Sequence, residues 1–265
     1  MLARTLFLLG IALLPALPST RLLVTVVEAK TGRAVADLKA ADFTVLDDKT
    51  PRAVEAVESA TGLVDIMLLL DTSLVGEMVR PLAGNLIAQL QPKEQMAVVS
   101  FHSSADLIQD FTASKELLKR AVANVKYGNT PRVLDALYAA MDGGFESSGF
   151  RRVILLLTTG YEGPSRVTEK DAIRLARKNG VSIFPIYVVG SEKWLFENLA
   201  RQTGGASFRV GDMRKSGTPE PGAAIFDALR RHYVVTIQGS LSPSDKLKVT
   251  VNRPEKLNAS ALPLE

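Results

Sequence analysis

The sequence predicts an α/β fold: a doubly wound, mostly parallel sheet with helices on both faces, plus a small β unit formed by the N- and C-terminal segments. Two short apolar runs, residues 66–70 and 153–157, have no polar face and are typical of strands buried on both sides of a parallel sheet. Between and after them, strand patterns alternate with helical ones. Toward both chain ends the pattern indicates only short strands separated by turns, so we expect the ends to form the β unit.

Length and composition are those of a globular protein. The chain has 265 residues, of which 46% are hydrophobic and 23% charged, enough for one large domain or for a medium domain with a small one. Its 32 basic residues are scattered among 28 acidic ones, so the net charge of +4 forms no cluster and predicts no nucleic-acid partner. Because the chain has no cysteine, thiol catalysis and Cys-type zinc sites are excluded.

The first 19 residues have the pattern of a signal peptide. Arg4 supplies the charged start, residues 6–14 the apolar core, and residues 15–19 the prolines and small residues of a cleavage region. The apolar core is too short to cross a bilayer of about 30 Å as a helix. We therefore expect an exported protein, periplasmic or secreted, with no integral membrane span beyond this segment. A buried N-terminal helix and an uncleaved anchor are the alternatives.

Residues 20–60 form the expected N-terminal β segment, and residues 231–265 the C-terminal one. Strand patterns with turns between them cover residues 22–28, 42–46, 54–58, 234–237 and 247–251. Near residue 60 the pattern changes to strand-helix-strand, so residues 61–230 are the expected α/β domain. Because short, half-buried strands need partners, we expect the two end segments to pack together, with the α/β domain inserted between them.

Within the α/β domain, strands and helices alternate along the chain. Strands are predicted at residues 64–70, 95–101, 105–111, 151–158, 181–189 and 206–210. Helices are predicted over residues 76–90, 114–125, 130–141, 168–180, 192–202 and 223–231. Ser114, Thr130 and Thr168 are the expected N-caps, with Pro131 at the first position of its helix. Pro185 places its strand near a sheet edge.

No catalytic motif accompanies this fold. The residues after the first buried strand, 71–76 (DTSLVG), lack the glycines of a dinucleotide-binding loop, and the chain contains neither a P-loop nor a G-x-S-x-G elbow. His102 and His232 have no evident Ser and Asp partners, so we expect surface or strand-end residues. The sequence therefore predicts that the protein is not an enzyme.

Polar residues follow the first buried strand at Asp71, Thr72 and Ser73. Ligands of open α/β sheets bind outside the carboxyl ends of the strands, and Mg²⁺ prefers oxygen ligands. This stretch, the turn at residues 128–130 and the segment 156–160 (LLTTG) resemble the metal-ion-dependent adhesion site of the von Willebrand factor A (VWA) family, whose fold is Rossmann-like. In that family a D-x-S-x-S motif, a later Thr and a later Asp hold the ion, and the partner supplies an acidic group.

The resemblance implies Asp71, Ser73 and Thr130 as metal ligands, but it is broken at two positions. Val75 stands where the family has its second serine, and Thr159 where it has its later aspartate. Since Val75 has no ligand atom and Thr159 no charge, we expect a degenerate site with no metal or with weakly bound Mg²⁺ or Mn²⁺. The alternative is that the three matching residues only cap loops and helix starts by hydrogen bonds.

The flanking segments extend the resemblance over most of the chain after residue 20. Residues 35–48 (VADLKAADFTVLDD) and 231–235 (RHYVV) resemble stretches around the VWA domain in bacterial secreted VWFA-related proteins described from acidobacteria. This resemblance implies non-catalytic protein-protein binding or adhesion outside the cytoplasm, with a partner that the sequence does not identify. A metal-assisted hydrolase using the face around Asp71, and a structural envelope protein, are the alternatives.

Overall fold

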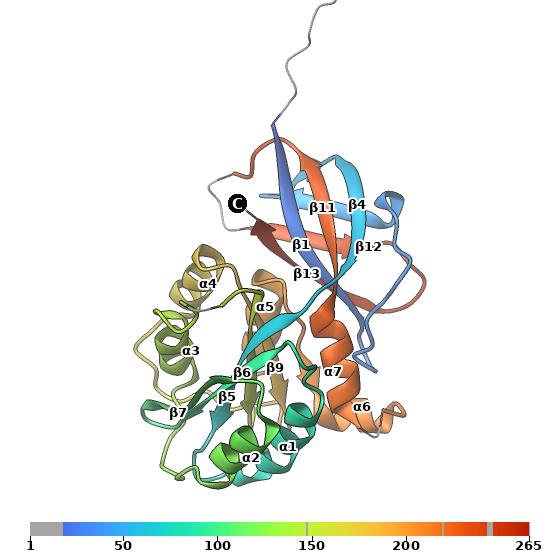
Figure 1. Cartoon of the computed structure of the whole chain (residues 1–265). Helices are drawn as coiled ribbons and strands as arrows, with labels where there is room; N and C mark the ends of the chain where they lie inside the picture. Colours follow the sequence, from blue (N-terminus) through green and yellow to red (C-terminus); the bar gives the residue numbers. More distant parts are fainter. Residues whose placement is uncertain (1–17, 147, 219, 243–245, 265) are drawn as a thin grey trace, which may run out of the picture.

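The computed structural model describes residues 18–146, 148–218, 220–242 and 246–264. The predicted signal peptide, residues 1–19, lies outside the described residues except for its last two positions. The strands form a six-stranded central sheet and two smaller sheets, one of four strands and one of three (Figure 1). None of the helices in the described ranges has the length and apolar character needed to cross a membrane.

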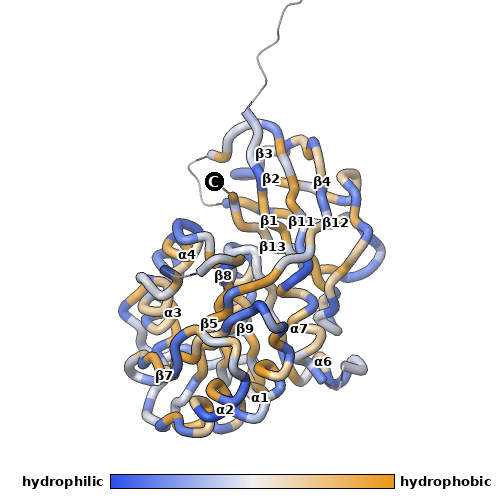
Figure 2. The backbone as a smooth tube through the Cα atoms, viewed as in Figure 1, coloured by the Kyte–Doolittle hydropathy of each residue, from blue (hydrophilic) through white to orange (hydrophobic). Residues whose placement is uncertain are grey.

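The central sheet has the strand order β10-β9-β8-β5-β6-β7, and only β7 is antiparallel to its neighbour. Its strands are β5 Val64–Asp71, β6 Gln95–Phe101, β7 Ala105–Thr112, β8 Arg151–Thr158, β9 Val181–Tyr187 and β10 Phe208–Arg209. Every residue of β5 is buried, and Figure 2 shows the hydrophobic colour of this strand in the middle of the sheet. The predicted mostly parallel, doubly wound sheet is confirmed.

Helices cover both faces of this sheet. They are α1 Arg80–Ala88, α2 Lys115–Ala123, α3 Val133–Met141, α4 Glu169–Lys178, α5 Lys193–Gln202, α6 Val210–Lys215 and α7 Pro221–Arg230. Successive residues of β5 point to opposite faces. Ile66 and Leu68 pack in one core with α1, α2, α6 and α7. Met67 and Leu69 pack in the other core with α3, α4 and α5.

The two chain ends together form the β unit. Its strands are β1 Ser19–Glu28, β2 Phe43–Asp47, β3 Thr50–Arg52, β4 Val54–Thr61, β11 Arg231–Gln238, β12 Leu247–Val251 and β13 Leu257–Leu264. They pair as β13-β1-β11-β4 and β12-β2-β3, all antiparallel, so β1 lies between two C-terminal strands as predicted. The two sheets share one apolar core, in which the rings of Phe43 and Tyr233 meet edge to face at 5.6 Å.

The start of α3 differs from the prediction. The helix begins at Val133 and its N-cap position is Arg132, so the expectations that Thr130 caps it and that Pro131 takes its first position are wrong. The amide of Val133 donates instead to the carboxylate of Glu162, at 2.9 Å, from the loop after β8. A distant acidic side chain thus replaces the local cap. The other two predicted caps, Ser114 and Thr168, accept hydrogen bonds from their first turns.

Two further elements are shorter than predicted. The helix expected over residues 76–90 consists of a 3₁₀ turn at Gly76–Met78 and of α1, which has Pro81 in its first turn. The strand expected at residues 206–210 shrinks to β10, because α6 begins directly after it. Since β10 pairs only with the last two residues of β9, Pro185 lies where β9 has no outer partner, in agreement with its predicted place near an edge.

Arg151, at the start of β8, connects the central sheet to its surroundings. Its guanidinium donates to the carbonyl of Leu229 in the last turn of α7 (2.7 Å) and to the carbonyl of Gly204 beyond α5 (3.1 Å). Both acceptors lie at helix C-termini, which carry partial negative charge. Burial lowers the pKa of Arg151 to about 9, so the side chain remains protonated at neutral pH. The hydroxyl of Thr25 in β1 donates to the same Gly204 carbonyl (2.8 Å), so the β unit joins this network.

Replacing Arg151 should destabilise the whole protein. Arg151→Met removes the cation and leaves buried carbonyls without this donor, each at a cost of about 1–3 kcal/mol. We expect a loss of about 2–4 kcal/mol in the free energy of unfolding, measured by urea denaturation. Arg120→Met, on the exposed side of α2, is the matched control and should change it by less than about 0.5 kcal/mol. Equal stability of the two variants would contradict this role of Arg151.

Candidate functional site

The candidate site lies at the carboxyl edge of the central sheet, where β5, β8 and β9 end side by side. These three strands are neighbours and parallel, so the loops that follow them meet at the same edge. Asp71 is the last residue of β5, and Thr158 the last of β8. The loop before α3 joins them, because the amide of Leu74 donates to the carbonyl of Asn129 (3.3 Å). This is the region in which open α/β sheets bind ligands.

Asp71 is fully buried, and neutral donors satisfy its carboxylate. Oδ1 accepts a hydrogen bond from the amide of Ser73 (2.9 Å). Oδ2 accepts three: from the Thr158 hydroxyl (3.1 Å), the Thr159 amide (3.0 Å) and the Thr159 hydroxyl (2.9 Å). No ion pair with Asp71 occurs among the residues that the structure describes. Charged hydrogen bonds of this kind stabilise a buried carboxylate by about 1.5–3 kcal/mol each.

Two glycines let the surrounding loops approach this closely. A Cβ on Gly76 would lie 2.3 Å from the backbone oxygen of Asp71, so only glycine allows the loop to fold back over the strand end. Gly160 has a φ of +101°, a conformation that favours glycine, and a Cβ there would meet the Val189 carbonyl at 2.1 Å. The loops after β5, β8 and β9 are thus held against one another around Asp71.

The structure brings three of the sequence-predicted residues together and leaves two at the periphery. Ser73 and Thr159 are buried beside Asp71. The hydroxyl of Ser73 is buried and has no hydrogen-bond partner among the described residues. Thr130 is exposed on the adjoining loop, and Val75 is 55% exposed. Neither is hydrogen-bonded to Asp71 by its side chain.

This donor set does not fit a resident divalent cation. Asp71 supplies the only carboxylate of the predicted ligand set, and its two oxygens already accept four hydrogen bonds. The hydroxyl of Thr159 donates its hydrogen bond to the same carboxylate, and Val75 has no ligand atom. The Ser73 oxygen is the one spare neutral ligand in the buried part of the set. Elsewhere in the described ranges, no three His, Asp or Glu side chains gather as they would around a metal ion.

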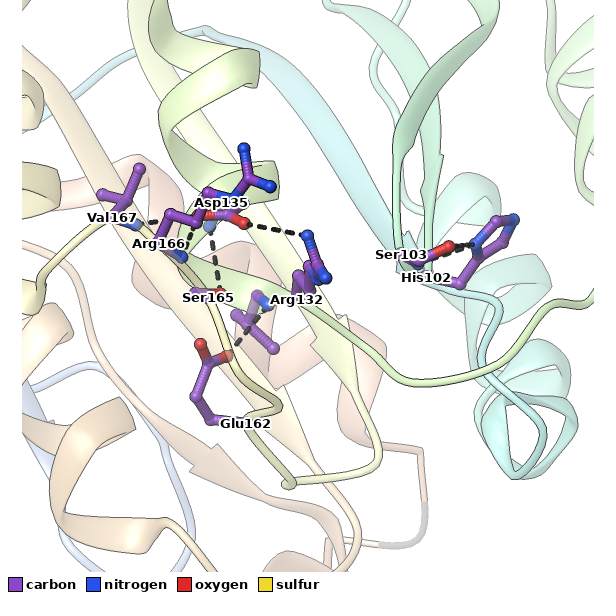
Figure 3. A network of polar contacts seen from close by, with 9 residues as sticks. His102, Ser103, Arg132, Asp135, Glu162, Ser165, Arg166 and Val167 are labelled. Carbon is purple, nitrogen blue, oxygen red and sulfur yellow. Dashed lines mark hydrogen bonds and ion pairs between the residues drawn. The ribbon is translucent and has the colours of Figure 1, made fainter.

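A second polar network ties the loop after β8 to the start of α3 (Figure 3). The carboxylate of Glu162 caps Val133, and burial raises the pKa of Glu162. The carboxylate of Asp135, in the first turn of α3, accepts from the backbone amides of Arg166 and Val167 (2.8 and 2.9 Å). Sequence reasoning missed Glu162, because its spacing from Thr159 carries no signal of which helix it caps. This network holds the β8 loop against the start of α3.

The two histidines lie near the ends of strands. His102 follows β6, and its ring shares a hydrogen bond with the hydroxyl of its neighbour Ser103 (2.9 Å), as Figure 3 shows. His232 lies in β11, where burial and the nearby Arg151 lower its pKa. Both positions agree with the predicted surface or strand-end roles.

Exposed apolar side chains surround the site, which sequence reasoning also missed. They lie in the segments that follow β5, β8 and β9, and we call this set the apolar rim: Leu74, Val75, Met78, Tyr161, Val189 and Trp194. Leu74 is 75% exposed and Trp194, the only tryptophan of the chain, is 63% exposed. Single exposed apolar residues are ordinary, but a group at one sheet edge is typical of an interaction surface.

The hydroxyl of Thr159 should be a measurable source of stability. Thr159→Val keeps the shape and removes one donor to Asp71, so we expect the free energy of unfolding to fall by about 1.5–3 kcal/mol in urea denaturation. Thr250→Val, on an exposed strand position, makes the same chemical change and should alter it by less than about 0.5 kcal/mol. A Thr159→Val protein of unchanged stability would mean that the hydroxyl does not compensate Asp71.

Comparison with known proteins places this arrangement in context. The family model of the von Willebrand factor type A domain matches residues 65–219. Proximal thread matrix protein 1 from the mussel byssus, solved with a zinc-occupied MIDAS motif, is similar with a TM-score of 0.57 and 19% identity. The match covers 68% of this chain but only 50% of the byssus protein, so this chain spans about half of that protein's length.

A second solved structure is similar over nearly its whole length. The conserved hypothetical protein BatB from Bacteroides thetaiotaomicron matches with a TM-score of 0.51 and 16% identity, over 63% of this chain and 99% of that one. At these identities the likeness shows the fold alone. The search of curated proteins gave no match.

Proposed function

The chain belongs to the von Willebrand factor type A domain family, and on that premise we propose that it is a non-catalytic protein-binding or adhesion module whose strand-end face binds a partner without a resident metal ion. VWA domains are generally interaction domains. The observation that carries the proposal is the apolar rim, which lies in the segments around an Asp71 carboxylate that already accepts hydrogen bonds from within the protein.

The polar centre of this face is a degenerate metal-ion-dependent adhesion site. Asp71, Ser73 and Thr130 agree with the family pattern, whereas Val75 and Thr159 occupy the positions of missing ligands. Thr159 removes the second negative charge and donates to Asp71 in its place. The site therefore holds no metal ion or binds Mg²⁺ or Mn²⁺ only weakly, because the affinity for a hard cation depends on the charge of its ligands. The zinc-occupied motif of the mussel protein belongs to that protein and is not carried over.

The partner should offer an apolar contact surface to this face. Val75 stands where the family has a serine ligand, and its exposed side chain adds apolar area to the rim. Aromatic residues and methionine are enriched in interface cores, and the rim contains Met78, Tyr161 and Trp194. The hydrolase alternative would need several carboxylates around Asp71, but the groups that donate hydrogen bonds to Asp71 are hydroxyls and amides.

The remaining assignments belong to the same proposal. Residues 1–19 are a signal peptide of an exported bacterial protein, periplasmic or secreted, related to the acidobacterial VWFA-related group. Residues 20–60 and 231–265 form the β unit, and residues 61–230 the VWA domain. The pairing of β1 with β11 and β13 supports these boundaries.

Site-specific photo-cross-linking in the native host tests the binding face. A benzophenone side chain at Met78 or at Val189 should join the same partner protein, because both residues lie on the apolar rim. Leu117, exposed on α2, is the control position and should give no adduct with it. Leu74→Ser should lower the yield from Val189 about tenfold, as expected for loss of an apolar anchor. Absence of a rim adduct, or an equal yield from Leu117, would overturn the proposal.

A further inference from the structure

β12 is an edge strand with an open side. It pairs with β2 alone. The carbonyl of Lys246 accepts a hydrogen bond from the amide of Asp48 (3.3 Å), and the amide of Asn252 donates to the carbonyl of Asp42 (2.7 Å). The even-numbered residues of β12 therefore point their backbone N–H and C=O groups toward β2. In an antiparallel ladder the residues between them point their N–H and C=O groups to the other side. Those residues are Leu247, Val249 and Val251.

β13 has an open side as well. It pairs with β1 alone. The amide of Ala29 donates to the carbonyl of Lys256 (2.9 Å), so the even-numbered residues of β13 point their backbone groups toward β1. By the same alternation, Leu257 and Ala259 point their backbone groups away from β1. Over the described residues, no hydrogen bond is made by the outward backbone groups of these two positions or of Val249 and Val251.

Both strands line one cleft, with a volume of about 350 Å³. Residues 248–251 of β12 and 257–260 of β13 form one side of it, and α5 with the loop that follows forms the other. This volume is at the lower end of the range of ligand sites, about 300–1,000 Å³. An unpaired strand edge that faces a cleft is a template for an added strand. The occupant that suits it is a short extended peptide.

The charges around the cleft select the chemistry of that peptide. Arg201 and Lys248 line the cleft and also an adjoining hollow of about 450 Å³, which adds Lys49 and Lys246. Glu197 is the one acidic side chain that lines either hollow in the described part of the chain, and it is ion-paired with a lysine of α5 at 3.4 Å. Lys246 is itself ion-paired with Asp48 at 3.6 Å, whereas Arg201, Lys248 and Lys49 have no acidic partner among the described residues. Three cations against one paired acid favour an acidic segment.

We propose that the cleft between α5 and the open edges of β12 and β13 is a second binding site, which takes a short, extended, acidic segment of a partner protein. The backbone of the segment pairs with the outward amide and carbonyl groups of Val249 and Val251. Its carboxylates lie beside Arg201 and Lys248, and charge-assisted hydrogen bonds to these cations select acidic side chains. The site is built from the β unit and α5, and it does not depend on the function proposed for the Asp71 face.

A blocked octapeptide of alternating Glu and Val residues is the probe, and its Lys-Val counterpart the control. Titration of the ¹⁵N-labelled protein by NMR should give a Kd at or below about 1 mM for the Glu peptide, and at least tenfold weaker binding for the Lys peptide. The amides of Val249, Val251 and Ala259 should shift. N-methylation of the pairing peptide amides leaves the charge unchanged and should weaken binding at least tenfold, because it removes the backbone donors.

Protein variants test the same site from the other side. Arg201→Glu with Lys248→Glu should weaken binding of the Glu peptide at least tenfold, whereas Lys119→Glu with Arg120→Glu, on the exposed face of α2, should leave it unchanged. Three results would overturn the proposal: no binding of the Glu peptide up to about 10 mM, binding that tolerates N-methylation, or shifts confined to residues outside β12 and β13.

Discussion

The buried carboxylate of Asp71 is the constraint on which the strand-end face depends. A carboxylate removed from water must be compensated, and here four hydrogen bonds from neutral groups do so. The donors come from the loop after β5 and from the end of β8, so one interaction joins two neighbouring strands and fixes both loops. Those loops carry most of the apolar rim. The hydrogen bonds that compensate the buried Asp71 carboxylate therefore also fix the position of most of the apolar rim.

Thr159 separates this face from the family pattern. A carboxylate at that position would confront Asp71 with a like charge, which a cation would have to offset. The threonine hydroxyl donates to Asp71 Oδ2 at 2.9 Å instead, so a group of the protein compensates the buried carboxylate at this position. Val75, in place of a polar ligand, turns to solvent and joins the rim. On our account, this face binds its partner through apolar contacts at the place where the family pattern has a metal ion.

The sequence reveals those features that rest on local patterns. The apolar run in β5 predicts a buried central strand, and the short strands at both ends predict the pairing of β1 with β11 and β13. Features that depend on distant contacts are not visible in it. Glu162 caps α3 across 29 positions, so Thr130 was wrongly expected to do so. The role of Arg151 depends on two helix ends that only the folded chain brings to it. Val75 and Thr159 are conspicuous in the sequence, but the hydrogen bond of Thr159 to Asp71 is not.

Calorimetric titration with Mg²⁺ and Mn²⁺ tests the central claim most directly, on the native protein and on the Val75→Ser, Thr159→Asp double variant. The account predicts no resolvable binding by the native protein. The double variant should be less stable without the ion, because two carboxylates repel, and should bind the ion and regain stability by linkage. Micromolar binding by the native protein would contradict the claim. A double variant that does not bind would show that Asp71, Ser73 and Thr130 do not converge on an ion.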